Sequence, residues 1–198
     1  MRLGIFGGTF DPPHVGHLLV AIDAYEALSL DRMLVIPAAA QPLKGASPAV
    51  ASAEHRLEMV RRAFRDDSRF EVSDTEIERR GLSYTVDTLE EIAAQRQGDE
   101  LTLLLGRDAI SSFDRWKSPD RILQLARLAV IERAGMKKEE RDAYEGVIER
   151  TGATMVTTRR VDVSSTEIRR RLKEGLSIRG FVVDSVDAYI AAEKLYKS

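Results

Sequence analysis

Short, mainly apolar runs recur along the chain and predict the strands of a buried sheet. The runs lie at residues 3–6, 34–37, 70–72, 101–105, 128–131 and 154–157. Strands that are covered on both faces are continuously apolar, whereas strands with one face in water alternate apolar and polar residues. The continuous runs therefore indicate interior strands of a parallel sheet.

Segments of helical character separate these runs. In residues 53–64, the apolar residues Leu57, Val60 and Phe64 recur at helical spacing. Helices are also expected at residues 14–28, 85–95, 137–150, 166–173 and 184–194, with a short helical piece after the strand at 101–105. This alternation predicts an α/β fold, a single Rossmann-like, doubly wound parallel sheet with helices on both faces and right-handed crossovers. Without a repeat or linker, residues 1–198 are expected to form one domain.

Composition and charge narrow the classes of protein. The 198 residues carry a net charge of −2, with basic and acidic residues interleaved, so charge does not predict general binding to nucleic acid. No apolar run approaches the length of a membrane-spanning helix, and no leader peptide is expected from the N-terminal pattern. The chain has no cysteine, which excludes disulfide bonds. A cytoplasmic protein is expected.

The stretch from Gly4 to His17 has the order strand, glycine turn, helix start. Gly7 and Gly8 end the first strand, and His14 and His17 lie three residues apart in the first turn of the next helix. The first N–H groups of a helix have no partner within it, and the helix dipole is positive at this end. Glycines let a ligand approach the backbone closely. The stretch therefore predicts a site for the phosphates of a nucleotide.

Two other interpretations of this stretch stay open on spacing alone. The glycine pair could form only a tight turn, with Asp11 as the cap of the helix that follows. His14 and His17 could instead bind a metal ion with Asp11 as a third ligand. The metal site ranks third, because three histidines and no cysteine would leave a four-ligand site dependent on remote carboxylates.

Further candidate residues follow the later strands. Lys44 lies in a loop rich in helix breakers, Asp108 follows Gly106 at the end of the most apolar strand, and Arg133 follows the next strand. The carboxyl ends of parallel strands meet at one edge of a sheet, where ligands bind. Each charge could equally be ordinary surface, and Trp116, the only tryptophan, could simply pack against its neighbours.

Two stretches have the pattern of capped helix starts. Thr85 is expected to cap one helix, and Ser165 and Thr166 open another, with Arg169 reaching back over its first turn. A guanidinium beside the N–H groups of a helix start suits a phosphate, and such N–H groups alone suit a carboxylate. Plain capping is the simpler interpretation of both stretches.

The motifs together resemble those of a known family. Residues 7–12 (Gly-Gly-Thr-Phe-Asp-Pro) and 14–17 (His-Val-Gly-His) are similar to the signature of the nucleotidylyltransferase superfamily, and residues 164–169 (Ser-Ser-Thr-Glu-Ile-Arg) to its second signature. The resemblance spans residues 4–171 and implies that His14, His17 and Arg169 stabilise the transition state. The residues that it implies for ATP are Gly7, Gly8, Thr9, Phe10, His14, Gly16, His17, Gly106, Asp108, Ser165, Thr166 and Arg169.

Residues 83–89 (Ser-Tyr-Thr-Val-Asp-Thr-Leu) resemble the segment by which one branch of the superfamily, the bacterial nicotinate-nucleotide adenylyltransferases, recognises nicotinate. The resemblance implies that the backbone at Tyr84 and Thr85 meets the pyridine carboxylate and that Trp116 stacks on the pyridine ring. The residues implied for the nicotinate nucleotide are Thr9, Lys44, Tyr84, Thr85, Trp116 and Arg133. The chain departs from the family at Leu43, where a histidine often precedes the lysine.

The resemblance also implies a reaction. AMP would pass from ATP to nicotinate mononucleotide, giving nicotinate adenine dinucleotide and pyrophosphate in NAD biosynthesis. Mg²⁺ would enter with the phosphates of ATP, and no protein residue is named as its ligand. The implied partners are ATP and nicotinate mononucleotide; neither nucleic acid nor a membrane is expected, and formation of a homo-oligomer is left open.

Other functions compete with this one. Another adenylyl- or cytidylyltransferase would act on pantetheine phosphate or a polyol phosphate, and the match at Tyr84, Thr85 and Trp116 speaks against it. A non-catalytic nucleotide-binding module would not need both histidines and the arginine of the second signature. An aminoacyl-tRNA synthetase fragment shares a similar histidine motif, but the chain shows no anticodon-binding or second catalytic region.

Overall fold

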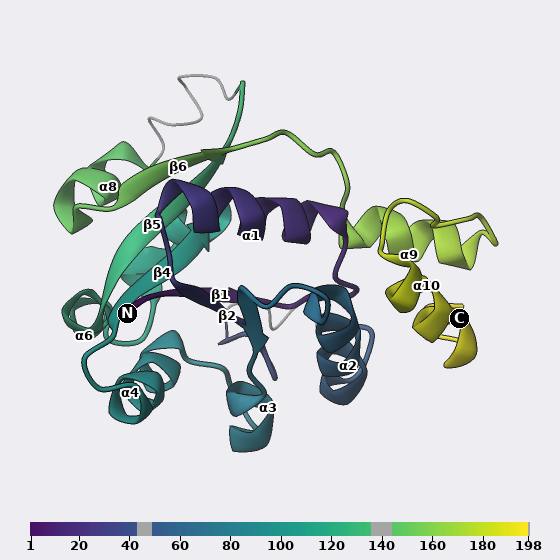
Figure 1. The fold of residues 1–198 in the computed structure, drawn as a ribbon, viewed down its shortest axis with the longest axis horizontal. Helices are drawn as coiled ribbons and strands as arrows, with labels where there is room; N and C mark the ends of the chain where they lie inside the picture. Colours follow the sequence, from purple (N-terminus) through teal and green to yellow (C-terminus); the bar gives the residue numbers. More distant parts are fainter. Residues whose placement is uncertain (43–48, 136–143, 198) are drawn as a thin grey trace. The chain divides into compact units, whose positions relative to one another are not determined.

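The computed structural model describes residues 1–42, 49–135 and 144–197, and their strands form a six-stranded sheet (Figure 1). The strands are β1 (Arg2–Gly8), β2 (Arg32–Pro37), β3 (Phe70–Val72), β4 (Glu100–Gly106), β5 (Ala126–Arg133) and β6 (Thr154–Thr158). Their order is β3-β2-β1-β4-β5-β6, and β1–β4, β4–β5 and β5–β6 pair in parallel. This order is that of Rossmann-like, doubly wound sheets, so the predicted fold class is confirmed.

Helices join these strands where helical spacing predicted them, with two differences. The helices are α1 (Val15–Ala27), α2 (Ala53–Phe64), α3 (Thr75–Arg79), α4 (Thr85–Gln95), α5 (Arg107–Ser111), α6 (Pro119–Leu125), α8 (Glu145–Thr151), α9 (Ser165–Lys173) and α10 (Asp184–Ala192). Helix α3 was not expected, and two helices, α5 and α6, stand where one short helical piece was expected after β4. Of the helix expected at 137–150, the part before residue 144 lies outside the described residues. No helix in the described ranges has the length and apolarity needed to cross a membrane.

The chain divides into two compact units, each built from separate stretches of sequence. The first unit comprises Met1–Phe6, Val20–Leu34 and Tyr84–Arg160. The second comprises Gly7–Leu19, Val35–Ser83 and Val161–Ser198. Because the chain passes between the units several times, neither corresponds to one half of the sequence. The single domain expected for residues 1–198 stays a prediction.

The core of the first unit lies along β4 and β5. Leu103 pairs in register with Leu128, and both side chains are buried. Helix α4 packs against α6, which contributes the buried side chain of Ile122. Continuous burial on neighbouring strands explains why these segments were apolar throughout rather than alternating.

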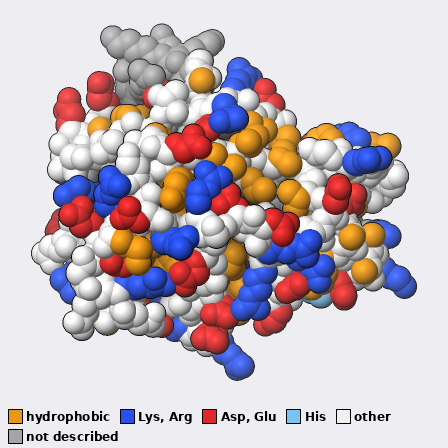
Figure 2. Space-filling model, in the orientation of Figure 1, with side chains coloured by type: hydrophobic (Ala, Val, Ile, Leu, Met, Phe, Trp, Pro, Cys, Tyr) orange, Lys and Arg blue, Asp and Glu red, His pale blue; other side chains and the backbone are white. Residues whose placement is uncertain are grey.

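The core of the second unit is a cluster in which α10 packs against α2 and α9 contributes Ile168. Its buried members include Met59 of α2 and Ile190 of α10, and both are almost fully shielded from solvent. Helix α2 and the C-terminal helices therefore share one hydrophobic core. Figure 2 shows basic and acidic side chains interspersed over the face that it draws.

Arg56 of α2 is the largest fully buried side chain of the described residues, with 1% of its surface exposed. Its guanidinium donates to the carbonyl oxygens of Thr9 (2.9 Å), Ala38 (2.6 Å), Ala39 (2.9 Å) and Ala51 (3.3 Å). Burial lowers the pKa of Arg56, yet an arginine keeps its charge in proteins. Arg56 thus ties the segment after β1 to the segment after β2.

Replacing Arg56 with methionine is expected to lower the free energy of unfolding by about 2–5 kcal/mol, because buried carbonyl groups lose their donors. Urea denaturation measures the change. The matched control is Arg61→Met on the same helix, where an ion pair with Asp74 is about half exposed. That variant should change stability by less than about 1 kcal/mol. Equal losses in both variants would contradict the role of the buried guanidinium.

Candidate active site

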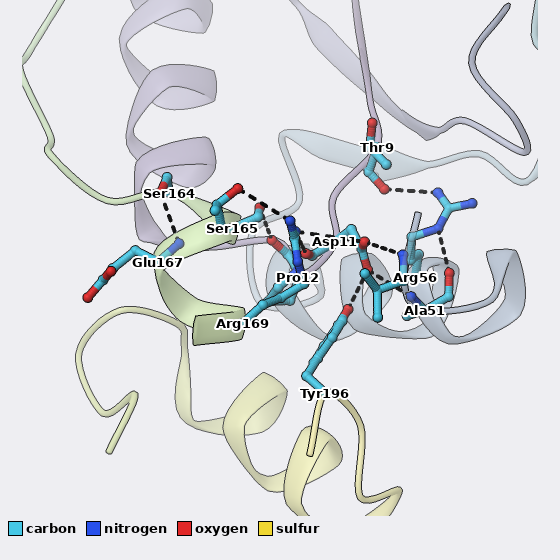
Figure 3. Close-up of polar contacts among 12 residues, drawn as sticks. Thr9, Asp11, Pro12, Ala51, Arg56, Ser164, Ser165, Glu167, Arg169 and Tyr196 are labelled. Atoms are coloured by element: carbon cyan, nitrogen blue, oxygen red, sulfur yellow. Dashed lines mark hydrogen bonds and ion pairs between the residues drawn. The ribbon is translucent and has the colours of Figure 1, made fainter. Parts of the chain in front are cut away.

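The candidate site begins at the segment that follows β1, where Asp11 is buried with only 5% of its surface exposed. Its carboxylate accepts hydrogen bonds from the backbone N–H groups of Val50 (2.7 Å) and Ala51 (3.1 Å). The hydroxyl of Tyr196 donates a third bond, at 2.7 Å (Figure 3). Asp11 therefore does not cap α1, contrary to one interpretation of the sequence, because its oxygens are turned toward these donors.

His14 and His17 lie together at the start of α1, as their spacing predicted. Their rings stack with centroids 3.7 Å apart and an interplanar angle of 27°. His14 immediately precedes the helix: its carbonyl accepts from the His17 N–H at 2.9 Å, and its own N–H donates to Nδ1 of His17 at 3.2 Å. In a capping box, the side chain three residues after the cap accepts the cap's backbone N–H in the same way.

This local hydrogen bond assigns the tautomer of His17. A neutral imidazole has one donor nitrogen and one acceptor nitrogen, and here Nδ1 is the acceptor. The proton of the neutral ring therefore sits on Nε2. An N–H donor at this position, beside the start of a helix, suits an anionic oxygen.

Phe10 and two glycines shape the surroundings of the histidines. The Phe10 ring meets the His17 ring edge-on, with centroids 4.9 Å apart. A Cβ atom at Gly8 would lie 2.8 Å from the Phe10 ring, and one at Gly16 would lie 3.0 Å from the His14 ring. At Gly7 a Cβ would meet nothing within 4 Å. Gly8 and Gly16 are thus required by packing, whereas Gly7 has room for a ligand.

The C-terminal motif meets the same segment (Figure 3). The cap of α9 is Ser164, whose Oγ accepts from the N–H of Glu167 at 3.2 Å, so the helix begins one residue before the expected Thr166. Ser165 Oγ donates to the carbonyl of Pro12 at 2.8 Å. The two signature motifs, 153 positions apart in sequence, are therefore joined directly.

Arg169 lies over the first turn of α9, as predicted. Its Nη2 donates to Thr166 Oγ1 at 3.3 Å, and its Nη1 donates to the main-chain carbonyl of Asp11 at 2.7 Å. Nη1 also lies 3.8 Å from Oδ2 of Asp11. A guanidinium has five N–H donors in a planar fork, so these two bonds leave donors that suit a phosphate.

The residues implied for the nicotinate nucleotide lie mainly in the first unit, where Tyr84 precedes α4. Tyr84, not Thr85, is the cap residue, and it makes no side-chain capping bond, so the expected Thr85 cap is wrong. The reason is local backbone geometry: Tyr84 is extended (φ −84°, ψ 124°), and its carbonyl accepts from the N–H of Asp87. Lys117 lies 4.8 Å over the Tyr84 ring and donates to the Asp87 carboxylate at 2.8 Å.

Trp116 is half-buried and directly follows a short 3-10 helix, Phe113–Arg115. Its Nε1 donates to Ser112 Oγ at 3.3 Å, and its ring centroid lies 5.6 Å from that of Phe113. Asp108 lies in α5, directly after Gly106 ends β4, and its side chain is fully exposed.

Two predicted residues have side chains that are not described. Arg133 is the last residue of β5, whereas the sequence pattern placed it after that strand, and its side chain lies outside the described atoms. Lys44 lies outside the described residues altogether.

Three residues of these surroundings were missed by sequence reasoning: Arg56, Lys117 and Tyr196. Arg56 and Tyr196 form hydrogen bonds with residues far away in sequence, so no local sequence pattern predicts these contacts. The sequence does contain one indication for Arg56. It lies three and four residues before Met59 and Val60, and therefore on the same buried face of α2. A charged residue on the apolar face of a helix is informative, because arginine is rarely buried unless its guanidinium is hydrogen-bonded.

Comparison with known proteins agrees with the fold and with these motifs. The profile of the cytidylyltransferase-like family matches residues 5–171, and the chain belongs to this family. Among curated proteins, the chain is 51% identical to a protein of Gemmatimonas aurantiaca named "probable nicotinate-nucleotide adenylyltransferase", over 100% of this chain and 93% of that one. It is 44% identical to a Thermus thermophilus protein of the same name, over 100% of both chains.

Among solved structures, a similar fold is found in the nicotinic acid mononucleotide adenylyltransferase of Plasmodium falciparum. Its complex with APC superposes with a TM-score of 0.76 over 98% of this chain and 96% of that one, at 18% identity. A second structure of that protein, in complex with NaAD, gives a TM-score of 0.75. At this identity the likeness establishes the fold.

The glycine pair offers a matched test of the packing around the histidines. Gly8→Ala should lower the free energy of unfolding by about 1–3 kcal/mol, because its Cβ collides with the Phe10 ring that contacts His17. Gly7→Ala, with open space around the new Cβ, should leave stability unchanged or slightly raised. Thermal and urea unfolding compare the two variants. A Gly8→Ala protein as stable as Gly7→Ala would rule out this packing constraint.

Proposed function

We propose that the protein transfers AMP from ATP to nicotinate mononucleotide, giving nicotinate adenine dinucleotide and pyrophosphate, in the biosynthesis of NAD. The observation that carries the proposal is the joining of the two signature motifs at one segment. Ser165 donates to the carbonyl of Pro12, and Arg169 donates to the carbonyl of Asp11. These two carbonyls lie two and three residues before His14, which immediately precedes α1, and His17 lies in the first turn of that helix. Relatives of similar length carry the corresponding name.

The reaction is a displacement at phosphorus. A 5′-phosphate oxygen of nicotinate mononucleotide forms a bond to the α-phosphorus of ATP, while the bond to the bridging α–β oxygen breaks and pyrophosphate leaves. The nucleophile is already an anion at neutral pH, so no protein base is needed. Catalysis then consists of in-line positioning and of donors directed at the charge that develops on the phosphoryl oxygens.

The second unit supplies those donors. His17 offers Nε2–H, and the stacked ring of His14 lies against it. Arg169 offers the donors that its bonds to Asp11 and Thr166 leave. Together with the backbone at Gly7 and the positive end of the α1 helix dipole, they form a positively polarised surface for the triphosphate. His14, His17 and Arg169 are the proposed catalytic residues.

The remaining assignments follow the family motifs and are part of the same proposal. Residues proposed to contact ATP besides these three are Gly7, Gly8, Thr9, Phe10, Gly16, Gly106, Asp108, Ser165 and Thr166. Residues proposed for the nicotinate nucleotide are Thr9, Lys44, Tyr84, Thr85, Trp116 and Arg133. At the α4 start, the first N–H groups suit the pyridine carboxylate. A cytoplasmic location and self-association stay predictions.

Magnesium is proposed to accompany ATP. Mg²⁺ keeps several waters and binds mainly through the phosphates of nucleotides, where it neutralises charge. Within residues 1–42, 49–135 and 144–197, no group of three or more His, Cys, Asp or Glu side chains could hold a metal ion by itself. Since Asp11 already accepts three hydrogen bonds, a protein cage built on it does not fit, and binding through phosphate and water does.

Pyrophosphate release tests the function directly. The protein is incubated with ATP and Mg²⁺ and, in parallel, with nicotinate mononucleotide, nicotinamide mononucleotide or phosphopantetheine. A clear preference for nicotinate mononucleotide is expected. Equal use of both pyridine nucleotides would keep the reaction class and remove the role of the α4 start in selecting a carboxylate. Turnover only with phosphopantetheine would overturn the substrate, and no turnover at all would leave a nucleotide-binding module.

Replacing His17 with alanine is expected to lower kcat by roughly 10²–10³-fold, as loss of one donor to a developing oxyanion does in other enzymes. Steady-state pyrophosphate release measures the change. His55→Ala is the control, because His55 bonds to Tyr189 in the C-terminal cluster. It should keep kcat within about twofold. Undiminished kcat in His17→Ala would remove His17 from the catalytic residues.

Trp116→Ala is expected to raise the KM for nicotinate mononucleotide roughly tenfold while changing the KM for ATP little, because an aromatic face that stacks on a ring contributes about 1–3 kcal/mol. Trp116→Phe keeps a smaller aromatic face and should lie between wild type and Trp116→Ala. Initial rates at varied concentrations of each substrate provide the two constants. An equal rise in both KM values would argue against stacking on the pyridine.

A further inference from the structure

We infer that Tyr196, near the C-terminus, is a positioning residue for Arg169: its hydroxyl holds the buried Asp11 carboxylate, so that Arg169 is oriented by the Asp11 main chain and keeps its other donors for phosphate. The inference rests on the proposed function, since it concerns how one proposed catalytic side chain is held. It assigns a role to a residue that neither signature motif contains.

The bond between Tyr196 and Asp11 joins two buried groups. Each residue is only 5% exposed, and the hydroxyl lies 2.7 Å from Oδ1 of Asp11 (Figure 3). Burial, and then the bond to Asp11, raise the pKa of Tyr196. The phenol is therefore protonated at neutral pH and donates to the carboxylate.

The end of the chain is shaped to deliver this hydroxyl. Helix α10 ends at Ala192, and Lys194, two residues later, is left-handed (φ 54°). The N–H of Leu195 bonds to the carbonyl of Ile190 at 3.0 Å, as in a Schellman motif. Tyr196 is itself left-handed (φ 62°). Two such conformations in non-glycine residues persist only where surrounding contacts impose them. Here the contacts are those of the cluster that buries Tyr196 with Met59.

The geometry at Arg169 shows what the hydroxyl prevents. Nη1 bonds to the neutral main-chain carbonyl of Asp11 at 2.7 Å but stands 3.8 Å from Oδ2 of the same residue. The carboxylate is satisfied instead by the N–H groups of Val50 and Ala51 and by the Tyr196 hydroxyl. Without the hydroxyl, the buried carboxylate lacks a donor, and a bidentate pair with Arg169 becomes the nearest replacement.

Such a pair would occupy the donors that the phosphates need. Loss of the Tyr196 hydroxyl should therefore weaken the use of ATP rather than that of nicotinate mononucleotide. We expect Tyr196→Phe to lower kcat/KM for ATP about tenfold, the order that one hydrogen bond to a charged group contributes, and to leave the KM for nicotinate mononucleotide within twofold.

Tyr189→Phe is the matched control. Tyr189 lies in α10 and is partly buried against the same cluster. Its hydroxyl also shares one hydrogen bond, with Nδ1 of His55 at 2.8 Å. Both variants remove one oxygen atom from the same C-terminal region. Tyr189→Phe should keep kcat/KM for both substrates, and unfolding curves of the two variants report any general loss of stability.

A double-mutant cycle with Arg169→Ala separates positioning from a structural role. If Tyr196 acts through Arg169, adding Tyr196→Phe to Arg169→Ala should change kcat/KM for ATP by less than twofold. A full tenfold loss in that background, or equal behaviour of Tyr196→Phe and Tyr189→Phe, would overturn the inference.

Calorimetric titration with ATP and Mg²⁺ keeps the test independent of the proposed reaction. If the wild-type protein shows no turnover with nicotinate mononucleotide, the proposed function fails, and the dissociation constants of the same variants still decide the role of Tyr196. A weaker ATP affinity in Tyr196→Phe that disappears in the Arg169→Ala background supports positioning. Unchanged affinity in Tyr196→Phe overturns it.

Discussion

The buried carboxylate of Asp11 is the constraint on which the second unit depends. Burying a charge is costly unless it is hydrogen-bonded, and the donors available to Asp11 come from the residues before α2 and from the end of the chain. The main chain of Asp11 in turn anchors Arg169. Because one residue contacts three distant segments, the geometry of the first signature motif requires that the C-terminal helices be folded and packed.

Arg56 performs the complementary task on the other side of the same segment. It is buried, positive and bonded to four carbonyls, one of them that of Thr9, two residues before Asp11. The two charges are satisfied mainly by backbone groups, not by each other. Networks of this kind fix a backbone firmly when every member is satisfied. Donors held in place before the substrate binds need no reorganisation during the reaction.

The sequence predicted the sheet well, for physical reasons that can be seen in particular elements. Strands β4 and β5 are buried on both faces, so their apolar runs were continuous and could be recognised. Helix α3 buries no side chain, and it therefore left no apolar periodicity to find. The elements that could be predicted are those whose burial requires a recognisable pattern of apolar residues.

The exact caps and the supporting contacts could not be predicted in the same way. Ser164, Ser165 and Thr166 are all capable caps, and the backbone angles of one residue decide among them. At α4 the extended Tyr84 precedes the helix, so Thr85 became its first residue. Tyr196 and Asp11 are 185 positions apart. Only the packed fold brings such a pair together, because no local rule relates them.

The pairing of the two histidines shows how a short motif can fix chemistry without distant help. The spacing of three residues lets His17 accept the N–H of His14, and that single bond places the ring proton on Nε2. Gly16, between them, leaves room for the stacked ring of His14. The position of the proton on the His17 ring is therefore determined within four consecutive residues, 14–17. The orientation of Arg169, by contrast, depends on Asp11 and on the fold that surrounds it. The two halves of the proposed phosphate site are therefore held by local contacts and by long-range contacts respectively.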